Sequence, residues 1–145
     1  MIHNDQEYRI AVERMEQQES LLAEQERALR EMGLDDEACI RALDPVRSFH
    51  AQLKEEIAEF ERLRRGIFDD LHNLNGLGHL LVAARIATMS QRELAERLGV
   101  DPSQVSRDER NEYRNVTLER ARRILDALGV DLVSTVARVG PNKAG

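Results

Sequence analysis

The sequence predicts a mostly α protein, in which an N-terminal antiparallel helical hairpin precedes a smaller helical bundle. Charged residues make up 33% of the 145 residues and aromatic residues only 3%, a composition typical of long solvated helices. Apolar residues recur at helical spacing in two long stretches of the first half, and shorter stretches separated by glycines follow in the second half. A chain of this length buries one ordinary core or two small ones, which excludes a large enzyme fold.

The two halves of the chain carry opposite net charge. Residues 1–75 contain 10 Lys and Arg against 18 Asp and Glu, a net charge of −8, whereas residues 76–145 contain 11 against 9, a net charge of +2. Basic surfaces recruit nucleic acid and acidic surfaces repel it, so this difference indicates separate partners or separate tasks for the two parts.

A first long helix is expected over about residues 5–32. Either Asn4 or Asp5 can cap its start, and Gly33 can supply the left-handed residue that ends it. An apolar stripe along this helix repeats every seven positions: Tyr8, Met15, Leu22 and Leu29. Because the stripe is narrow, the helix needs a partner to cover it.

The partner is a second helix that begins near Asp35, with acidic residues in its first turn. Pro45 either kinks this helix or opens a new one at the first helical position, and Gly66 ends it. A short turn between the two stripes makes an antiparallel hairpin over 1–66, an acidic arm for interaction or dimerisation. The second stripe has six members: Val46, Phe49, Leu53, Ile57, Phe60 and Leu63.

Residues 67–76 lack a sustained period and contain Gly, Asn and Asp, so they are expected to form a linker. Its three apolar residues are expected to dock on one of the two domains: Ile67, Phe68 and Leu71. The remaining residues, 77–145, form the second domain with a C-terminal tail.

The second domain opens with a helix over 77–87, and the stretch after it predicts helix, tight turn, helix. Ser90 and Glu93 form a capping box that starts a helix over 91–98, whose buried face is Leu94, Ala95 and Leu98. Gly99 makes the sharp turn, Val100 fills the angle between the helices, and Asp101-Pro102 starts the next helix. Val105 faces the core, which leaves the opposite face of this helix free to enter a DNA major groove.

That outward face has side chains suited to reading DNA, because Arg pairs with guanine, Gln with adenine, and Ser bonds to bases or phosphate. Its members are Pro102, Ser103, Gln104, Ser106, Arg107 and Arg110. A third helix over 117–128, capped by Thr117, completes the bundle. The buried side of this helix is expected to be Leu118, Ala121, Ile124, Leu125 and Leu128. The tail over 131–137 is rich in β-branched residues and fits either a short strand or a helical face.

Residues 77–132, with SQRELAERLGV followed by VSR, resemble the Xre/Cro-type helix-turn-helix family of DNA-binding regulators, which have a lambda-repressor-like fold. The resemblance implies that Gln91 reaches a backbone phosphate and that Arg110, Arg114 and Asn115 flank the DNA backbone. It also implies a base-facing set: Pro102, Ser103, Gln104, Ser106 and Arg107.

Two features depart from the family pattern. The turn RIATMSQ lacks the glycine that usually precedes the first motif helix. Asp108 stands where the family usually has an apolar residue, so its carboxylate must find an arginine, a backbone amide or solvent. Alternatively the helix ends early and RNEYRN forms a longer loop, in which Tyr113 supplies the missing apolar group.

The start NDQEYRIAVERMEQ and the stretch LKEEIAEFERLRRG of the first half resemble the N-terminal helical arm of HigA-like antitoxins, which also repress their own operons. This resemblance implies a toxin as a possible protein partner of the arm.

Catalytic, metal and membrane-spanning functions are not expected. None of the four His lies at i, i+4 from another or beside a Cys pair, and GxSxG, Walker-type and HExxH motifs are absent. We therefore expect neither an enzyme nor a cofactor. The run LLVAA at 80–84 is far shorter than the ~20 residues of a membrane span. The single Cys39 and the polar start MIHNDQE favour a cytoplasmic location.

These observations predict a cytoplasmic, dimeric, sequence-specific transcriptional regulator that binds an inverted-repeat DNA operator, most simply a repressor. A homodimer is expected because one recognition helix buries too little surface for tight specific binding. Either the arm or the tail supplies the dimer interface. The alternative function is an antitoxin that neutralises a basic toxin through the acidic arm and represses its own operon.

Overall fold

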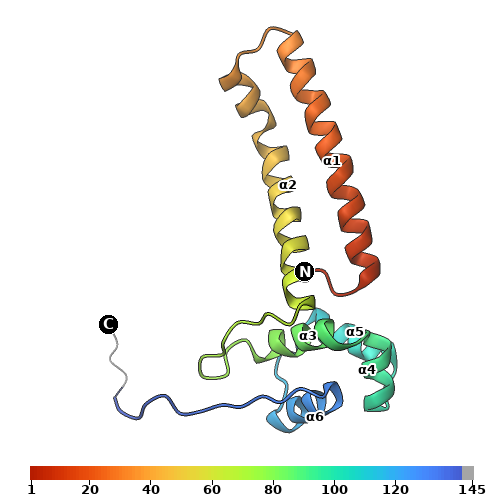
Figure 1. Ribbon diagram of the computed structural model, residues 1–145, viewed down its shortest axis with the longest axis vertical. Helices are drawn as coiled ribbons and strands as arrows, with labels where there is room; N and C mark the ends of the chain where they lie inside the picture. The colour runs from red at the N-terminus through yellow and green to blue at the C-terminus, as the bar shows by residue number, and fades with distance from the viewer. Residues whose placement is uncertain (142–145) are drawn as a thin grey trace.

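The computed structural model describes residues 1–141 and confirms a mostly α fold (Figure 1). The two long helices α1 and α2 form a hairpin that stands on a compact group of four shorter helices, α3 to α6. No β-strand is present between residues 1 and 141, although one isolated β-bridge joins His72 to Asn75. The elements are α1 (Asp5–Glu31), α2 (Asp36–Arg64), α3 (Leu77–Thr88), α4 (Gln91–Leu98), α5 (Pro102–Arg110) and α6 (Leu118–Leu128).

The hairpin forms as predicted, and local capping sets its ends. Asn4, rather than Asp5, caps α1, because its side-chain oxygen accepts a hydrogen bond from the Glu7 amide at 2.8 Å. Asp35 caps α2 in the same way. At the base of the hairpin the Tyr8 ring stacks on Phe60 with a centroid separation of 5.2 Å.

The second helix is continuous from Asp36 to Arg64, so the alternative in which Pro45 opens a new helix is wrong. A proline inside a helix removes one backbone hydrogen bond and leaves the carbonyl four residues earlier without its donor. Here that carbonyl belongs to Arg41, an exposed residue whose backbone can bond to water. Ion pairs with α1 lie on both sides of Pro45, from Arg30 to Asp36 before it and from Glu26 to Arg47 after it.

The prediction that Phe49 belongs to the buried stripe is wrong, because its side chain is 72% exposed. A two-helix hairpin has a single narrow seam, and helical positions repeat every 3.6 rather than 3.5 residues, so a side chain at the margin of the stripe turns out of it. The distal half of the α2 seam buries only Cys39 and Leu43.

The base of the hairpin and the bundle share one continuous hydrophobic core. Ile2, Phe60 and Leu63 from the hairpin side belong to the same buried cluster as Leu81 and Ile124 from the bundle. The division of the chain at 67–76 therefore stays a prediction. Within that segment the expected docking of Ile67 is wrong, because its side chain is 49% exposed.

The bundle packs α3 against α6 and sets α4 and α5 at its side (Figure 1). Two residues predicted to be covered are exposed: Leu118 and Val100. Leu118 lies in the first turn of α6, where no neighbouring helix reaches it, and the left-handed turn at Gly99 (φ +70°) directs Val100 outward. Neither alternative for the tail is found, since residues 131–141 are extended and exposed and pair with no strand.

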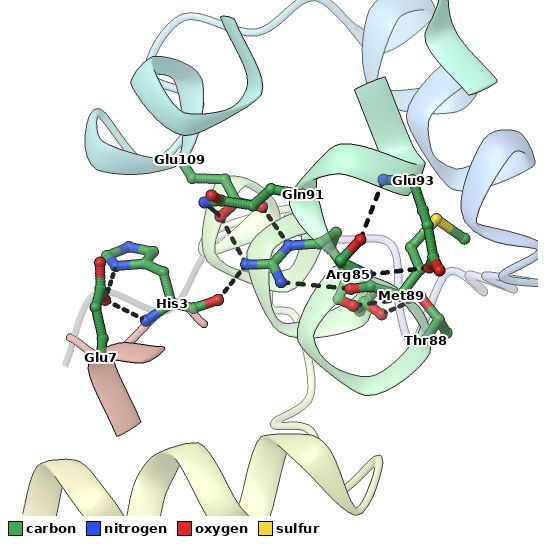
Figure 2. Close-up of polar contacts among 10 residues, drawn as sticks. His3, Glu7, Arg85, Thr88, Met89, Gln91, Glu93 and Glu109 are labelled. Atoms are coloured by element: carbon green, nitrogen blue, oxygen red, sulfur yellow. Dashed lines mark hydrogen bonds and ion pairs between the residues drawn. The ribbon is translucent and has the colours of Figure 1, made fainter. Parts of the chain in front are cut away.

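A buried ion pair fastens α5 to α3 (Figure 2). Arg85 Nε donates to Glu109 Oε1 at 2.7 Å and Arg85 Nη2 donates to Glu109 Oε2 at 2.8 Å, and both side chains are almost fully buried. Arg85 Nη2 also donates to the His3 carbonyl of the N-terminal segment. Gln91 Nε2 donates to Glu109 Oε2 at 2.7 Å, so the carboxylate is bonded from two helices.

The turn after α5 closes the bundle against the start of α3. Tyr113 is only 4% exposed and fills the core from this turn, although α5 ends at Arg110, as expected, and not early. A Cβ atom added to Gly78 would lie 1.9 Å from the Glu112 carbonyl oxygen. This close approach requires glycine at position 78.

Replacing Gly78 with alanine separates two opposing effects. Helix propensity alone predicts a gain of about 1 kcal/mol, because alanine is the better helix former. The backbone contact predicts a loss of about 1–3 kcal/mol or more, because the turn at Glu112 must move. We expect the Gly78→Ala variant to be destabilised in urea unfolding followed by circular dichroism. A stability equal to or above that of the wild type would contradict the packing described here.

Replacing Glu109 with alanine leaves Arg85 buried without its partner, so we expect a loss of about 3–5 kcal/mol in the free energy of unfolding. The double variant Arg85→Met with Glu109→Met removes both charges and should recover most of this loss. Urea unfolding of the wild type and of both variants measures the two effects. If the double variant were no more stable than the single one, the unpaired charge would not be the cause.

Candidate DNA-binding surface

Local sequence signals build the unit formed by α4, the turn and α5. Ser90 Oγ accepts from the Glu93 amide at 3.1 Å and the Glu93 carboxylate accepts from the Ser90 amide at 3.2 Å, which is the predicted capping box. Gly99 ends α4 in a left-handed conformation. Asp101 then caps α5 by accepting from the Ser103 amide at 2.8 Å, with Pro102 at the first helical position.

Two contacts hold the unit in the bundle. Val105 of α5 is buried, as predicted, together with Leu94 and Ala95 of α4. The Arg97 guanidinium donates to the Ala127 carbonyl at 2.8 Å, which ties the end of α4 to α6. With its inner face held in this way, α5 presents its other face to solvent.

The structure places the predicted base-facing residues on that outer face. Pro102, Ser103 and Arg107 are exposed, and Gln104 and Ser106 are half-buried. All five come from the first two turns of α5, so they share one short stretch of helix surface. No protein side chain of residues 1–141 covers the exposed members.

A chain of hydrogen bonds orders two of these residues. Arg107 Nη2 donates to Gln104 Oε1 at 3.2 Å, and Gln104 Nε2 donates to Asp108 Oδ1 at 3.1 Å. Asp108 Oδ2 in turn accepts from Arg120 Nη2 of α6 at 2.5 Å. The carboxylate that departs from the family pattern thus finds an arginine, one of the predicted solutions, and it orients Gln104 from behind.

The electrostatics of α5 separate its acids from its bases. Both carboxylates in the helix are paired with arginines of other helices, Glu109 with Arg85 and Asp108 with Arg120. No carboxylate of the described chain lies within ion-pairing distance of the cationic groups on the outer side and in the following turn: Arg107, Arg110 and Arg114. The hydrogen bond from Ser103 lowers the pKa of the capping Asp101 below its usual range.

Gln91 is the first residue of α4, and its side-chain amide is occupied by Glu109. Its half-buried position at the helix start, where free backbone amides favour anions, fits a phosphate contact through the backbone or a reoriented side chain. Arg110, Arg114 and Asn115 are exposed at the end of α5 and in the turn that follows it. Asn115 adopts φ +62°, a conformation that Asn tolerates better than most residues.

Sequence reasoning missed the role of Arg85 and Glu109. A signal was present, because Arg85 is the one charged residue in the otherwise apolar stretch LLVAARIA. An arginine on the buried side of a helix requires an acidic partner, but the partner lies 24 positions away and nothing local identifies it.

Within residues 1–141 no helix is long and apolar enough to cross a membrane. The same part of the chain has no cluster of three His, Cys, Asp or Glu side chains able to hold a metal ion.

Comparison with known proteins gives one match. Residues 83–134 match the family model described as Helix-turn-helix, a range that runs from the middle of α3 to a few residues past α6. The hairpin lies outside the matched range. Neither a curated protein nor a solved structure matches the chain. Residues 83–134, about a third of the chain, are therefore similar to the Xre/lambda-repressor-like helix-turn-helix family of DNA-binding domains.

Proposed function

We propose that this protein is a sequence-specific transcriptional regulator, acting as a dimeric repressor, with α5 as its recognition helix in the DNA major groove. One observation carries the proposal. The carboxylates of α5 are paired toward the bundle, whereas Arg107, Arg110 and Arg114 have no acidic partner among residues 1–141. Unpaired arginines on the outer side of a helix and in the turn that follows it are suited to phosphate and guanine contacts.

The outer face divides into two proposed roles. The first turns of α5 read bases, since the N-terminal residues of a recognition helix approach base edges most closely. The base-reading set is Pro102, Ser103, Gln104, Ser106 and Arg107. The residues at the edges contact the DNA backbone: Gln91, Arg110, Arg114 and Asn115.

The acidity of the hairpin is compatible with DNA binding because of where it lies. The turn between α1 and α2 is at the end of the molecule opposite the bundle (Figure 1). Charges separated by more than ~8 Å of physiological saline are largely screened. The charge near α5 therefore decides the interaction with DNA, and the net charge of the whole chain does not.

A second candidate function is supported by the same acidity. Residues 1–75 have a net charge of −8, and the turn between α1 and α2 lies at the end of the molecule opposite the bundle, so the distal part of the hairpin can bind a basic protein while the bundle holds DNA. This arrangement suits an antitoxin that covers a basic toxin and represses its own operon. A neighbouring gene for a small basic protein favours this function, and an isolated gene favours a regulator without a toxin.

The Arg107→Ala variant tests the base-reading role. We expect a loss of about 1–3 kcal/mol in specific binding, with non-specific binding nearly unchanged, because a bidentate contact to a base discriminates between sequences. Selection of genomic DNA fragments by the purified protein at about 150 mM salt finds the operator, and titration on that site measures the loss. The control is Arg122→Ala, an exposed arginine on α6. Equal losses on all sequences would refute base reading by Arg107.

The dimer predicts a symmetric site. We expect the selected fragments to share an inverted repeat with half-site centres ~34 Å apart, or a multiple of this distance, and sedimentation to show two protomers per site. A single asymmetric half-site bound by one protomer would contradict the dimer while leaving DNA binding itself intact.

A further inference from the structure

One side of α1, continued by the C-cap residue Met32, carries a row of exposed apolar residues that the hairpin does not use. Ile10, Leu21 and Met32 are 56%, 49% and 75% exposed. They are spaced 11 residues apart, which is about three turns of a helix, so they lie almost directly above one another. A repeated spacing distinguishes this row from apolar residues scattered singly over a surface.

Phe49 of α2 lies on the same side of the hairpin. Along the other side, Glu26 of α1 pairs with Arg47, and Glu19 of α1 pairs with Lys54. On α2, Phe49 is two positions after Arg47 and five before Lys54. On α1, Leu21 has the same offsets, two positions after Glu19 and five before Glu26. At ~100° per residue both side chains therefore point away from the paired side.

The two residues are also at the same level of the hairpin. The pairs Glu26–Arg47 and Glu19–Lys54 fix the antiparallel register, in which Leu21 and Phe49 are offset along the helix axis by only ~4.5 Å. Phe49, at 72% exposure, thus widens the apolar row at its middle.

Carboxylates without partners border this row. Glu13, Glu24 and Glu31 share one edge of α1, since their spacings of 11 and 7 residues are close to whole helical turns. The side chains of these three glutamates form no ion pair or hydrogen bond with any residue between 1 and 141. Glu19 and Glu26, in contrast, are both paired with cations of α2. The hairpin neutralises the acids on one side and leaves those on the other side free.

We propose that this face binds a basic amphipathic helix of another protein. We call it the hairpin face and define it by Ile10, Leu21, Met32, Phe49 and the three carboxylates Glu13, Glu24 and Glu31. Apolar side chains of the partner would cover the row, and its Lys or Arg side chains would reach the acidic edge. The partner helix would lie along the row, with apolar anchors repeated along one of its sides.

Charge argues against a second copy of this chain as the occupant. A copy would bring its own three carboxylates to a face that has one cation next to the row, Arg14. Like charges brought together across an interface oppose association, whereas a cationic partner gains both the pairing and the apolar contact. The proposal does not depend on DNA binding by α5, and it does not require that the partner be a toxin.

The test uses a defined probe and the full chain. The probe is a synthetic helical peptide with a leucine stripe bordered by lysines, and the reference peptide has the same composition with the leucines scattered around the helix. Fluorescence anisotropy measures the dissociation constant for each. We expect the striped peptide to bind in the micromolar range and at least about tenfold more tightly than the scattered one, because only the stripe matches the row.

Matched variants locate the contact. The double variant Leu21→Ser with Phe49→Ser should weaken binding about tenfold, because central apolar anchors dominate such interfaces. Ile40→Ser, 54% exposed and seven residues before Arg47 on the paired side, should leave it unchanged. The triple variant Glu13→Gln, Glu24→Gln, Glu31→Gln should weaken binding and reduce the salt dependence of binding. Its control is a second triple variant that removes the same number of charges elsewhere on the hairpin and should have a smaller effect: Glu16→Gln, Glu37→Gln, Glu55→Gln.

Three results would overturn the proposal. The first is equal binding of the two peptides, and the second is a dissociation constant weaker than about 1 mM for the striped one. The third is a homodimer in sedimentation that the Leu21→Ser and Phe49→Ser changes dissociate, which would assign the face to a second copy. Circular dichroism confirms that each variant is helical, and DNA binding by the same variants reports separately on the bundle.

Discussion

The position of α5 depends on the buried ion pair between Arg85 and Glu109. It joins α3, in the middle of the bundle, to the last turn of the proposed recognition helix, and the His3 carbonyl and the Gln91 amide complete its hydrogen bonding (Figure 2). A buried charge is tolerated only when its partner and the remaining lone pairs and protons are satisfied. The pair therefore permits one arrangement of α3, α4 and α5, and the outer face of α5 inherits that arrangement.

A second ion pair holds the same helix through α6. Asp108 bonds Arg120 of α6 and Gln104 of its own helix, so α5 is held through neighbouring residues by two different helices. Its acids are directed inward by these contacts, which leaves its outer side to arginine, serine and glutamine. The two ion pairs that hold the helix in place therefore also leave its outer surface positively charged, which favours contact with DNA.

The N-terminal segment connects the hairpin with this network. Ile2 lies in the common core and the His3 carbonyl accepts from Arg85, so residues far from the bundle in sequence contribute to its centre. The hairpin rests on the bundle through Phe60 and Leu63, while its distal half has few buried side chains. Such an arm is anchored at one end and free along its sides, which is where the unpaired apolar and acidic residues lie.

The sequence by itself determined the local structure. The capping residues Asn4 and Ser90 and the turn at Gly99 act within a few positions of themselves, so the helix limits and the helix-turn-helix unit could be predicted closely. Only the tertiary structure decided which apolar positions are covered, as Phe49 shows, and which charges are paired. Arg85 and Glu109 are 24 positions apart and Arg120 and Asp108 are 12 apart. Burial and pairing depend on helices that are distant in the chain, and no periodicity within one helix reports which neighbour will lie against it.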